Sequence, residues 1–497
     1  MVLAPAALWT RARSAAADRH SIDRLQVPSP VLMERAALCC AREALALGGG
    51  RPVWSLCGPG NNGGDGVALA RILHGWGVPA RVFLLVAPRP GSELAQQVAL
   101  ARRLGVAIAD GLPEETGEAV IVDAMLGTGA TPPLRAPFEA AVAWANAQAG
   151  PRLAVDIPTG IDADTGAAPG LAFRADCTVT FQRSKPGLHV TPGRAFAGRV
   201  VVADIGLVAE DRVEQAGLID PREVATWLAG LKAGGHKGER GHVGIVGGSA
   251  GTPGAAVLAG AAALRAGAGL VTIASDDREV QAQLVAHRPE LMVQPRGERP
   301  VPGAGALVVG PGLTRAEDRA GLAALWTDDP RPAIWDASAL GEIAAPVAAG
   351  RARILTPHPA EAARLLSART GEAWTAGWVQ ADRVAAARAL AAVTGAVAVL
   401  KGEGTLVAEG ARLAVCVSGG PALATAGSGD CLAGAIGALL ARGLPAWEAA
   451  CAGVHVHGVA GDRLTVGAVA LEVADAIAGV LAAPPADHPR FPRGALG

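Results

Sequence analysis

The sequence predicts two α/β domains, each built on a mostly parallel sheet that helices cover on both faces. Three observations lead to this fold class. The chain has 497 residues, which is too long for one ordinary domain. Short, continuously apolar runs alternate with stretches of helical spacing, as expected for strands buried on both faces. The alternation stops near residue 208 and restarts at Gly241, with no visible sequence repeat between the two halves.

The first half contains the elements of one such domain. A first surface helix is expected over 11–24, and further helices over 93–104 and 137–147. A glycine-rich loop is expected to lead into another helix at Val67. Strands are expected at the apolar runs 54–57, 80–86, 120–122, 153–155, 178–181 and 200–203.

The second half contains a similar series and ends near residue 482. Its expected strands are 241–248, 270–274, 306–309, 333–335, 353–355 and 397–400. The charged stretch 208–222 lacks a strand pattern and is the expected linker. We therefore expect a domain over 1–215, a domain over 225–482, and a disordered tail over 483–497.

The composition excludes several classes of function. The formal net charge is -1, so there is no basic excess for nucleic acid and no polybasic run for a membrane surface. No uncharged apolar run is long enough to span a membrane, and no targeting signal is visible, so we expect a cytoplasmic protein. Seven cysteines without a CxxC pair indicate free thiols in a reducing compartment. We interpret His455 and His457 as packing or surface residues.

The few lysines are a first indication of anion sites. Only four of the 44 basic residues are lysine, so a retained lysine is a candidate for a compact point charge. Lys237 and Lys401 each precede a glycine, and Lys185 precedes a Pro-Gly pair. Four ordinary surface lysines would give the same count, so this observation alone leaves both interpretations open.

The strongest local pattern is the run from Cys57 to Gly66, which reads CGPGNNGGDG between an expected strand and an expected helix. Glycines allow a ligand to approach the backbone closely, and the amides at a helix start bind anions. The spacing differs from the usual dinucleotide fingerprint. A plain turn rarely needs so many glycines together with Asn61, Asn62 and Asp65, so the pattern favours a binding loop.

Two further loops follow strands of the same domain. Asp123 opens the loop DAMLGTG, and Asp156 opens the loop DIPTGID. Ligands of an open parallel sheet lie at the carboxyl ends of strands, which is where both carboxylates are expected. Either Asp alone could be a helix cap. Oxygen ligands from Asn62, Asp123 and Thr159 would suit a hard cation.

Together the three loops resemble the N-terminal epimerase domain of the NAD(P)H-hydrate repair proteins, over roughly residues 8–206. The resemblance implies a Rossmann-like three-layer sandwich. It implies that Asn62, Asp123 and Thr159 hold potassium, with Thr159 in place of the usual Ser. Asp156 would transfer a proton, and Lys185 would assist with phosphate or proton transfer. The implied substrate-binding residues are Asn61, Asn62, Gly63, Gly64, Asp65, Gly127, Thr128, Gly129 and Asp156.

A second constellation lies near the end of the chain. The loop Ala424–Asp430 reads ATAGSGD and precedes a helical run from Cys431. Such a loop presents amides to phosphate, and its final Asp can take a proton from an attacking hydroxyl. A lone GxGD could be a helix cap. However, 401–405, which reads KGEGT, and 356–361, which reads TPHPAE, also follow strands.

These features resemble the ribokinase-like superfamily, and within it the ADP- or ATP-dependent NAD(P)H-hydrate dehydratase domain, over roughly residues 230–480. The resemblance implies a second three-layer sandwich, with Asp430 as catalytic base. Ser428 and Ser338 depart from the usual Thr and Asp, and His358 before a proline could equally be structural. The implied substrate-binding residues are Ala255, Gly312, His358 and Asp430. The implied nucleotide-binding residues are Lys401, Gly402, Glu403, Gly404, Thr405 and Gly429.

The two resemblances imply a bifunctional enzyme, an isomerase and a lyase, that repairs hydrated nicotinamide cofactors. Its substrates would be NADHX and NADPHX, and it would use ADP or ATP with magnesium. Related domains associate, so a homo-oligomer is expected. Two alternatives remain open: a ribokinase-like kinase of a vitamin precursor or sugar fused to a nucleotide-binding module, and a non-catalytic nucleotide sensor or scaffold. The sequence does not distinguish ADP from ATP or NADHX from NADPHX.

Overall fold

The structure is a computed structural model that describes residues 7–114, 117–210, 216–231 and 236–483. The described residues fold into two compact units, one over 7–216 and one over 217–483. We call them unit one and unit two and describe each by itself. All but the first residue of the expected tail 483–497 lies outside the described residues. None of the described helices is long and apolar enough to cross a membrane.

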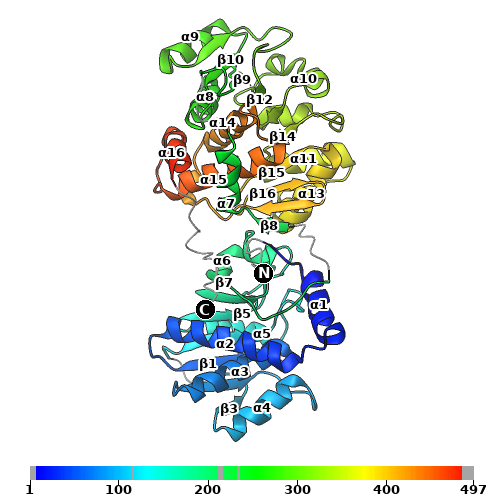
Figure 1. Cartoon of the computed structure of the whole chain (residues 1–497), viewed down its shortest axis with the longest axis vertical. Coiled ribbons are helices and arrows are strands. Elements are labelled where there is room, and N and C mark those ends of the chain that lie inside the picture. Colours follow the sequence, from blue (N-terminus) through cyan, green and yellow to red (C-terminus); the bar gives the residue numbers. More distant parts are fainter. Residues whose placement is uncertain (1–6, 115–116, 211–215, 232–235, 484–497) are drawn as a thin grey trace. The chain divides into compact units, whose positions relative to one another are not determined.

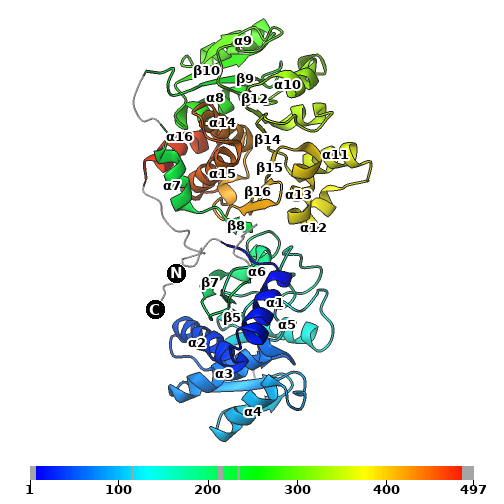
Figure 2. The same ribbon diagram turned by 45° about the vertical axis from the view of Figure 1, so that its right-hand side comes forward.

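Unit one is a three-layer sandwich around a seven-stranded parallel sheet with the order β3-β2-β1-β4-β5-β6-β7 (Figures 1 and 2). Its strands are β1 Val53–Cys57, β2 Ala80–Leu84, β3 Ala107–Asp110, β4 Val120–Ala124, β5 Arg152–Val155, β6 Cys177–Phe181 and β7 Arg199–Ala203. Its helices are α1 Arg11–Arg19, α2 Ser29–Gly48, α3 Asn61–Gly75, α4 Glu93–Arg103, α5 Phe138–Asn146 and α6 Arg194–Ala197. The predicted fold class is confirmed for this half.

Alternation within the strands separates the two apolar layers of unit one. Val53 and Cys57 of β1 pack with α2, α3 and α4, whereas Trp54 and Leu56 of the same strand pack with α5. Successive side chains of a strand point to opposite faces, so a strand covered on both sides is apolar throughout. This explains why β1 is buried at all five positions.

The expected start of one helix was wrong. Helix α3 begins at Asn61, whereas the sequence favoured a loop up to Gly66 and a helix from Val67. The glycines serve close packing within the helix: a Cβ on Gly63 would lie 2.0 Å from the carbonyl oxygen of Gly58. Low helix propensity is therefore overridden because the first turns of α3 press against the backbone of the preceding loop.

Unit two is also a three-layer sandwich, with the sheet order β11-β10-β9-β12-β13-β14-β15-β16-β17-β8. The strands from β11 to β15 are parallel, and β16 and β17 add an antiparallel hairpin. Its strands are β8 Ala216–Leu218, β9 His242–Val246, β10 Leu270–Ala274, β11 Met292–Gln294, β12 Ala306–Val309, β13 Ala333–Trp335, β14 Arg353–Leu355, β15 Val397–Leu400, β16 Leu406–Glu409 and β17 Arg412–Val415.

Helices cover both faces of this sheet (Figures 1 and 2). One face carries α7 Pro221–Ala229, α8 Pro253–Arg265, α9 Arg278–His287, α14 Ser428–Ala441, α15 Ala446–Asp462 and α16 Ala470–Ala482. The remaining helices are α10 Leu322–Asp328, α11 Pro359–Thr370, α12 Ala376–Ala381 and α13 Arg383–Thr394. The predicted fold class is confirmed for this half as well.

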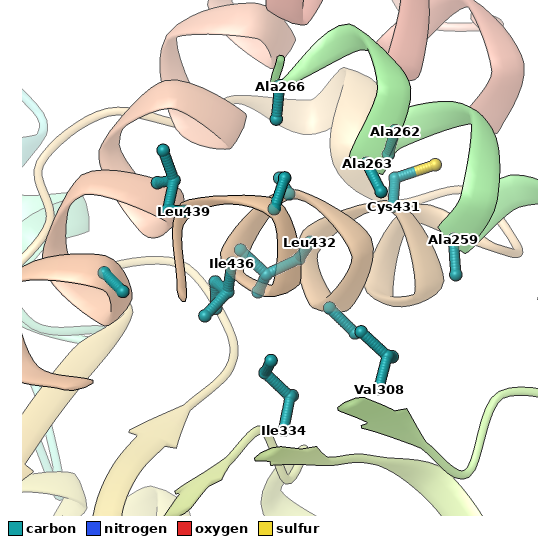
Figure 3. Close-up of a cluster of buried hydrophobic side chains, with 14 of the residues drawn as sticks. Ala259, Ala262, Ala263, Ala266, Val308, Ile334, Cys431, Leu432, Ile436 and Leu439 are labelled. Atoms are coloured by element: carbon teal, nitrogen blue, oxygen red, sulfur yellow. The ribbon is translucent and has the colours of Figure 1, made fainter. Parts of the chain in front are cut away.

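The core of unit two fixes the position of α14. Figure 3 shows Cys431, Leu432, Ile436 and Leu439 of this helix between alanines of α8 and the side chains of the sheet. The alanines are Ala259, Ala262, Ala263 and Ala266, and the sheet contributes Val308 and Ile334. Small side chains let α8 and α14 approach closely, so α14 is held between α8 and the sheet.

The expected linker 208–222 was partly wrong. Residues 216–218 form β8, an edge strand of the second sheet, and α7 begins at Pro221. The part 211–215 lies outside the described residues. An edge strand of three residues is too short to show an alternating pattern, which is why no strand was expected there. The hairpin of β16 and β17 was also not anticipated.

Candidate functional sites

The first site lies where the strand order of unit one reverses. From β1 the chain adds β2 and β3 on one side and β4 to β7 on the other, so β1 and β4 form the switch point. The loops after these two strands therefore diverge and leave a crevice at their carboxyl ends. The loop after β1 leads into α3, and the loop after β4 carries the run from Met125 to Gly129.

A pocket of about 550 Å³ occupies this crevice. Most of the predicted substrate-binding residues line it: Asn61, Asn62, Asp65, Gly127, Thr128, Gly129 and Asp156. Gly63 and Gly64 are buried behind the wall in the first turns of α3. The structure thus brings three separate loops together, as the sequence predicts, although two of the glycines support the wall and do not line the pocket.

Asp156 and Lys185 form a buried ion pair in this pocket. Nζ of Lys185 lies 2.6 Å from Oδ1 of Asp156, and the lysine is 2% exposed. Thr180 and the amide of Phe181 also donate to Oδ1, so three groups hold this one oxygen. Asp156 has a φ of 67°, a sparsely populated region that often marks functional sites.

Other carboxylates surround the pair. Asp18, Asp65 and Glu93 line the same pocket. Burial, followed by the charges of Asp156 and Glu93, raises the pKa of Asp65 well above its usual range. Burial also raises the pKa of Asp18. Burial therefore shifts Asp18 and Asp65 toward the protonated form, which can donate hydrogen bonds as well as accept them.

The predicted cation ligands lie beside this pocket. Asp123 is fully buried, and both its carboxylate oxygens accept hydrogen bonds from Thr159 at 2.7 Å. The hydroxyl of Thr159 also contacts the backbone of Leu126. The next residue, Gly127, lies against the side chain of Asn62. Burial raises the pKa of Asp123 to about 6 despite the hydrogen bonds it accepts.

The donor types of Asn62, Asp123 and Thr159 suit a hard cation. The donors are a carboxylate, a hydroxyl and an amide oxygen, which are the ligand types that hard cations prefer. Within the described part of the chain, no group of three or more His, Cys, Asp or Glu side chains could hold a metal ion. A cation would compensate the buried charge of Asp123.

The second site lies at the start of α14 in unit two. The helix begins at Ser428, three residues earlier than the expected Cys431, so Gly429 and Asp430 belong to its first turn. The free amides of a first helical turn attract anions. Burial raises the pKa of Asp430 to about 7, with Asp336 adding to the rise and Lys401 opposing it.

Lys401 connects Asp430 to two other carboxylates. Its Nζ lies 2.8 Å from Oδ1 of Asp336 and 3.9 Å from Oε2 of Glu361. Burial disfavours the charged form of Lys401, but Asp336 and Glu361 more than offset it, so its pKa is raised. Asp336 after β13, Lys401 after β15 and Glu361 in the first turn of α11 therefore form one charged cluster beside α14.

A pocket of about 460 Å³ adjoins this cluster. Five of the predicted nucleotide-binding residues line it, namely Lys401, Gly402, Glu403, Thr405 and Gly429. Gly404 is buried behind the loop. The opposite wall includes Ser418 to Pro421, His457 and Gly458. The glycine-rich loop 401–405, which we call the phosphate-type loop, and the start of α14 thus face the same space.

The predicted substrate-binding residues of unit two lie around the starts of α8, α11 and α14. Ala255 is in the first turn of α8, and a Cβ on Gly312 would lie 3.2 Å from its Cβ. His358 caps α11: its Nδ1 accepts from the amides of Ala360 and Glu361. His358 therefore has a structural role as a helix cap, and its half-exposed side chain places Nε2 3.4 Å from Oε1 of Glu361.

Comparisons with known proteins agree with this division. The family model described as NAD(P)H-hydrate dehydratase matches residues 243–478, and that described as YjeF-related protein N-terminus matches residues 29–187. The bifunctional NAD(P)H-hydrate repair enzyme Nnr of Moorella thermoacetica is 36% identical over 471 residues, which cover 86% of either chain. This chain belongs to the family of bifunctional NAD(P)H-hydrate repair enzymes.

Two further proteins resemble this repair enzyme over different spans. The bifunctional enzyme Nnr of Escherichia coli (strain K12) is 36% identical over 392 residues, which cover 76% of this chain and 74% of that protein. A solved ADP/ATP-dependent NAD(P)H-hydrate dehydratase of Bacillus subtilis is 29% identical, with a TM-score of 0.48, over 53% of this chain and 96% of that chain. The family resemblance predicted from the motifs is confirmed and favours repair over the kinase and sensor alternatives.

Several residues of the repair enzyme's second site were missed by sequence reasoning. His457 was interpreted as a packing or surface residue, but it lines the pocket, and its Nε2 lies 3.1 Å from Oγ of Ser428. Burial lowers the pKa of His457 to about 4, so it is neutral. The sequence assigns no role to Asp336, Glu361 or Arg383. The position of Asp336 at a strand end could have identified it.

Proposed function

We propose that this chain epimerises R- and S-NAD(P)HX at the pocket of unit one and dehydrates S-NAD(P)HX at the site of unit two, with ADP or ATP as phosphate donor. The observation that carries the proposal is the match of both halves to the repair family, with a pocket in each unit that the predicted site residues line. Hydration of the dihydronicotinamide ring places a hydroxyl on carbon six, and both reactions act at that carbon.

In unit one, Asp156 is the proposed proton-transfer group. Its Oδ1 is held by Lys185, Thr180 and the Phe181 amide, so the carboxylate is fixed where Asp156 lines the pocket. A fixed carboxylate beside a fixed ammonium can take the proton of the carbon-six hydroxyl and return it as the other epimer forms. Asp65, with its raised pKa, is suited to donate a hydrogen bond to the same ligand.

Asn62, Asp123 and Thr159 would hold a potassium ion beside this pocket. The ion would supply a positive charge next to the buried Asp123, whose hydrogen bonds come from neutral groups of Met125 and Thr159. The hydroxyl of Thr159 contacts the backbone of Leu126, and the next residue, Gly127, lies against Asn62 of α3.

In unit two, Asp430 is the proposed base. It takes the proton of the carbon-six hydroxyl as that oxygen attacks the terminal phosphate of ADP or ATP. The nucleotide leaves with one phosphate fewer, and loss of the new phosphate from carbon six, with a proton, restores the conjugated ring. Magnesium supplies charge neutralisation on the nucleotide phosphates when bound.

The proposed nucleotide contacts are Lys401 to Thr405 and Gly429, and Ala255, Gly312, His358 and Asp430 face the hydrated ring. We place the reaction in the cytoplasm, which the seven free cysteines support. A homo-oligomeric state stays a prediction.

Resolved epimers test the proposal. Pure S-NADHX with ADP or ATP and magnesium should return NADH, measured by its dihydronicotinamide absorbance. Pure R-NADHX without nucleotide should become a mixture of epimers, measured by chromatography. Absence of the first reaction would contradict the assignment of unit two, and absence of the second would contradict that of unit one.

A further inference from the structure

Arg383 is a buried cation directly behind the loop that carries Lys401 to Thr405. It begins α13 and is 1% exposed. Its Nη1 donates to the side-chain oxygen of Gln380 at 3.0 Å and to the carbonyl of Lys401 at 3.3 Å. Its Nη2 donates to the carbonyls of Leu400 at 3.4 Å and Gly404 at 3.3 Å. All four acceptors are neutral.

The charge of Arg383 is therefore poorly compensated. Burial lowers its pKa to about 10, with only Glu403 acting in the opposite direction, so the guanidinium remains charged at neutral pH. Its Nε is buried without a hydrogen-bond partner among the described residues. A buried cation with weak, neutral acceptors is costly to keep. Its hydrogen bonds to the described residues include none to a carboxylate that could offset the charge.

The neighbouring lysine does not leave spare positive charge for a phosphate. Nζ of Lys401 already lies 2.8 Å from Asp336 and within 3.9 Å of Glu361. Asp430 also acts on it electrostatically. Three carboxyl groups thus surround one ammonium, and Arg383 is a second cation at this end of the pocket.

The hydrogen bonds of Arg383 to backbone carbonyls fix the direction in which the peptide groups of the phosphate-type loop point. In a trans peptide the carbonyl of one residue and the amide of the next point in opposite directions. Carbonyls of Lys401 and Gly404 that point at Arg383 therefore direct the amides of Gly402 and Thr405 away from it. Gly402 and Thr405 line the pocket, so these two amides face the space where a phosphate would lie.

Gly402 permits this close approach. It has a φ of 131°, and a Cβ there would lie 2.6 Å from Nη1 of Arg383. The backbone of Gly402 therefore separates the guanidinium of Arg383 from the pocket.

We propose that Arg383 is a positioning residue for the nucleotide phosphates of the dehydratase reaction, which it serves by turning the amides of Gly402 and Thr405 toward the pocket from behind the loop. This inference rests on the proposed function, because it takes the pocket to be the nucleotide site. The phosphates are the anion that offsets the buried guanidinium, so nucleotide binding and Arg383 stabilise each other.

The test compares Arg383→Met, Arg383→Lys and the control Arg353→Met with the unmodified chain. Arg353 is also 1% exposed, and its guanidinium also donates to backbone carbonyls, those of Trp326, Asp329 and Arg331. Burial lowers its pKa to about 10 as well. It lies at the start of β14, away from the phosphate-type loop, so it controls for loss of a buried arginine.

Two quantities are measured: KM and kcat for Mg²⁺-ADP and Mg²⁺-ATP in the dehydration of S-NADHX, and the rise in Tm that each nucleotide causes. Because Arg383→Met loses charge-assisted hydrogen bonds, we expect it to raise the nucleotide KM by about tenfold or more, with a smaller change in kcat. The nucleotide-induced rise in Tm should shrink correspondingly. Arg383→Lys should be intermediate, and Arg353→Met should change Tm without changing the nucleotide KM.

An unchanged nucleotide KM in Arg383→Met would overturn the inference, and so would an equal increase in Arg353→Met. If Arg383→Met does not fold, Arg383→Lys decides: its single point charge cannot bridge three carbonyls, so an unchanged KM contradicts the inference. If the unmodified chain itself responds to neither nucleotide, the proposed function of unit two is wrong, which separates that failure from the failure of Arg383 alone.

Discussion

Nζ of Lys185 lies 2.6 Å from Oδ1 of Asp156 in unit one, and Nζ of Lys401 lies 2.8 Å from Oδ1 of Asp336 in unit two. In each unit a lysine from a loop meets an aspartate at the carboxyl end of a parallel strand. Half of the chain's four lysines are used in this way. A compact ammonium suits these sites because it pairs with a carboxylate while leaving one face of the group accessible.

Asp156→Asn should abolish epimerisation and leave dehydration intact. The amide cannot accept a proton, and removal of a general acid–base group typically costs about 10²–10⁴-fold in rate. The measurement is the interconversion of pure R-NADHX without nucleotide. Asp430→Asn is the matched control, since it should retain epimerisation and lose dehydration. A variant that lost both activities would indicate that the two assignments are not independent.

Potassium should stabilise the protein specifically through Asp123. A bound cation offsets the buried carboxylate, so Tm should rise in KCl relative to choline chloride at equal ionic strength. Asp123→Asn should remove the difference, because the neutral amide needs no counter-ion. Thr159→Ser, which keeps the hydroxyl, should retain it. An equal response of Asp123→Asn and the unmodified chain would contradict the proposed ligands.

Dehydration should depend on the ionisation of Asp430. Because its pKa is about 7, the base is increasingly protonated below that pH. We expect kcat/KM for S-NADHX to fall about tenfold per pH unit on the acid side and to level off on the alkaline side. A profile that stays flat down to about pH 5 would exclude Asp430 as the base.

The same carboxyl group should reduce stability when ionised. In the folded state its pKa lies above the usual 3.8, so between 3.8 and about 7 the folded form holds a proton that the unfolded form has lost. Stability is therefore lost as the pH rises through this window. Asp430→Asn removes the effect, and thermal unfolding at about pH 8, above the window, should show a higher Tm for the inactive variant. A lower Tm would contradict this electrostatic explanation.

The contact between His457 and Ser428 should affect nucleotide binding. Nε2 of His457 lies 3.0 Å from the carbonyl of Ser428 and holds the start of α14. His457→Ala removes this hydrogen bond, which is worth about 1–3 kcal/mol when a buried partner is left unpaired, so the nucleotide KM should rise by about tenfold. Ser428→Thr keeps the hydroxyl and should have little effect. Both values come from the dehydratase assay.

The sequence could predict those site residues that stand next to a recognisable local pattern, such as an apolar strand or a glycine-rich helix start. Asn62 and Asp156 follow strands and Asp123 lies near the end of one, and parallel strands bring their carboxyl ends to one edge, so topology alone unites them. Asp430 follows the same logic at a glycine-rich helix start. These predictions need only the strand positions, which the apolar runs indicate.

The missed parts depend on packing between distant segments. Arg383 lies in the sequence RVAAARAL, which is typical of an ordinary helix start, and only the docking of α13 against β15 and β16 places its guanidinium behind the phosphate-type loop. His457 belongs to an apolar helix, and its role follows from the packing of α15 against α14. The early start of α3 was missed because glycine has a low helix propensity. Close packing against the preceding loop nevertheless requires glycine in the first turns of this helix.

A single assay tests directly whether one chain holds both complementary activities. The purified protein is given a mixture of R- and S-NADHX with ADP or ATP and magnesium, and dihydronicotinamide absorbance is followed to completion. We expect the entire pool to return as NADH, faster than spontaneous epimerisation allows. Recovery of the S fraction alone, with the R fraction left behind, would contradict an active epimerase in unit one, and no recovery would contradict the repair function altogether.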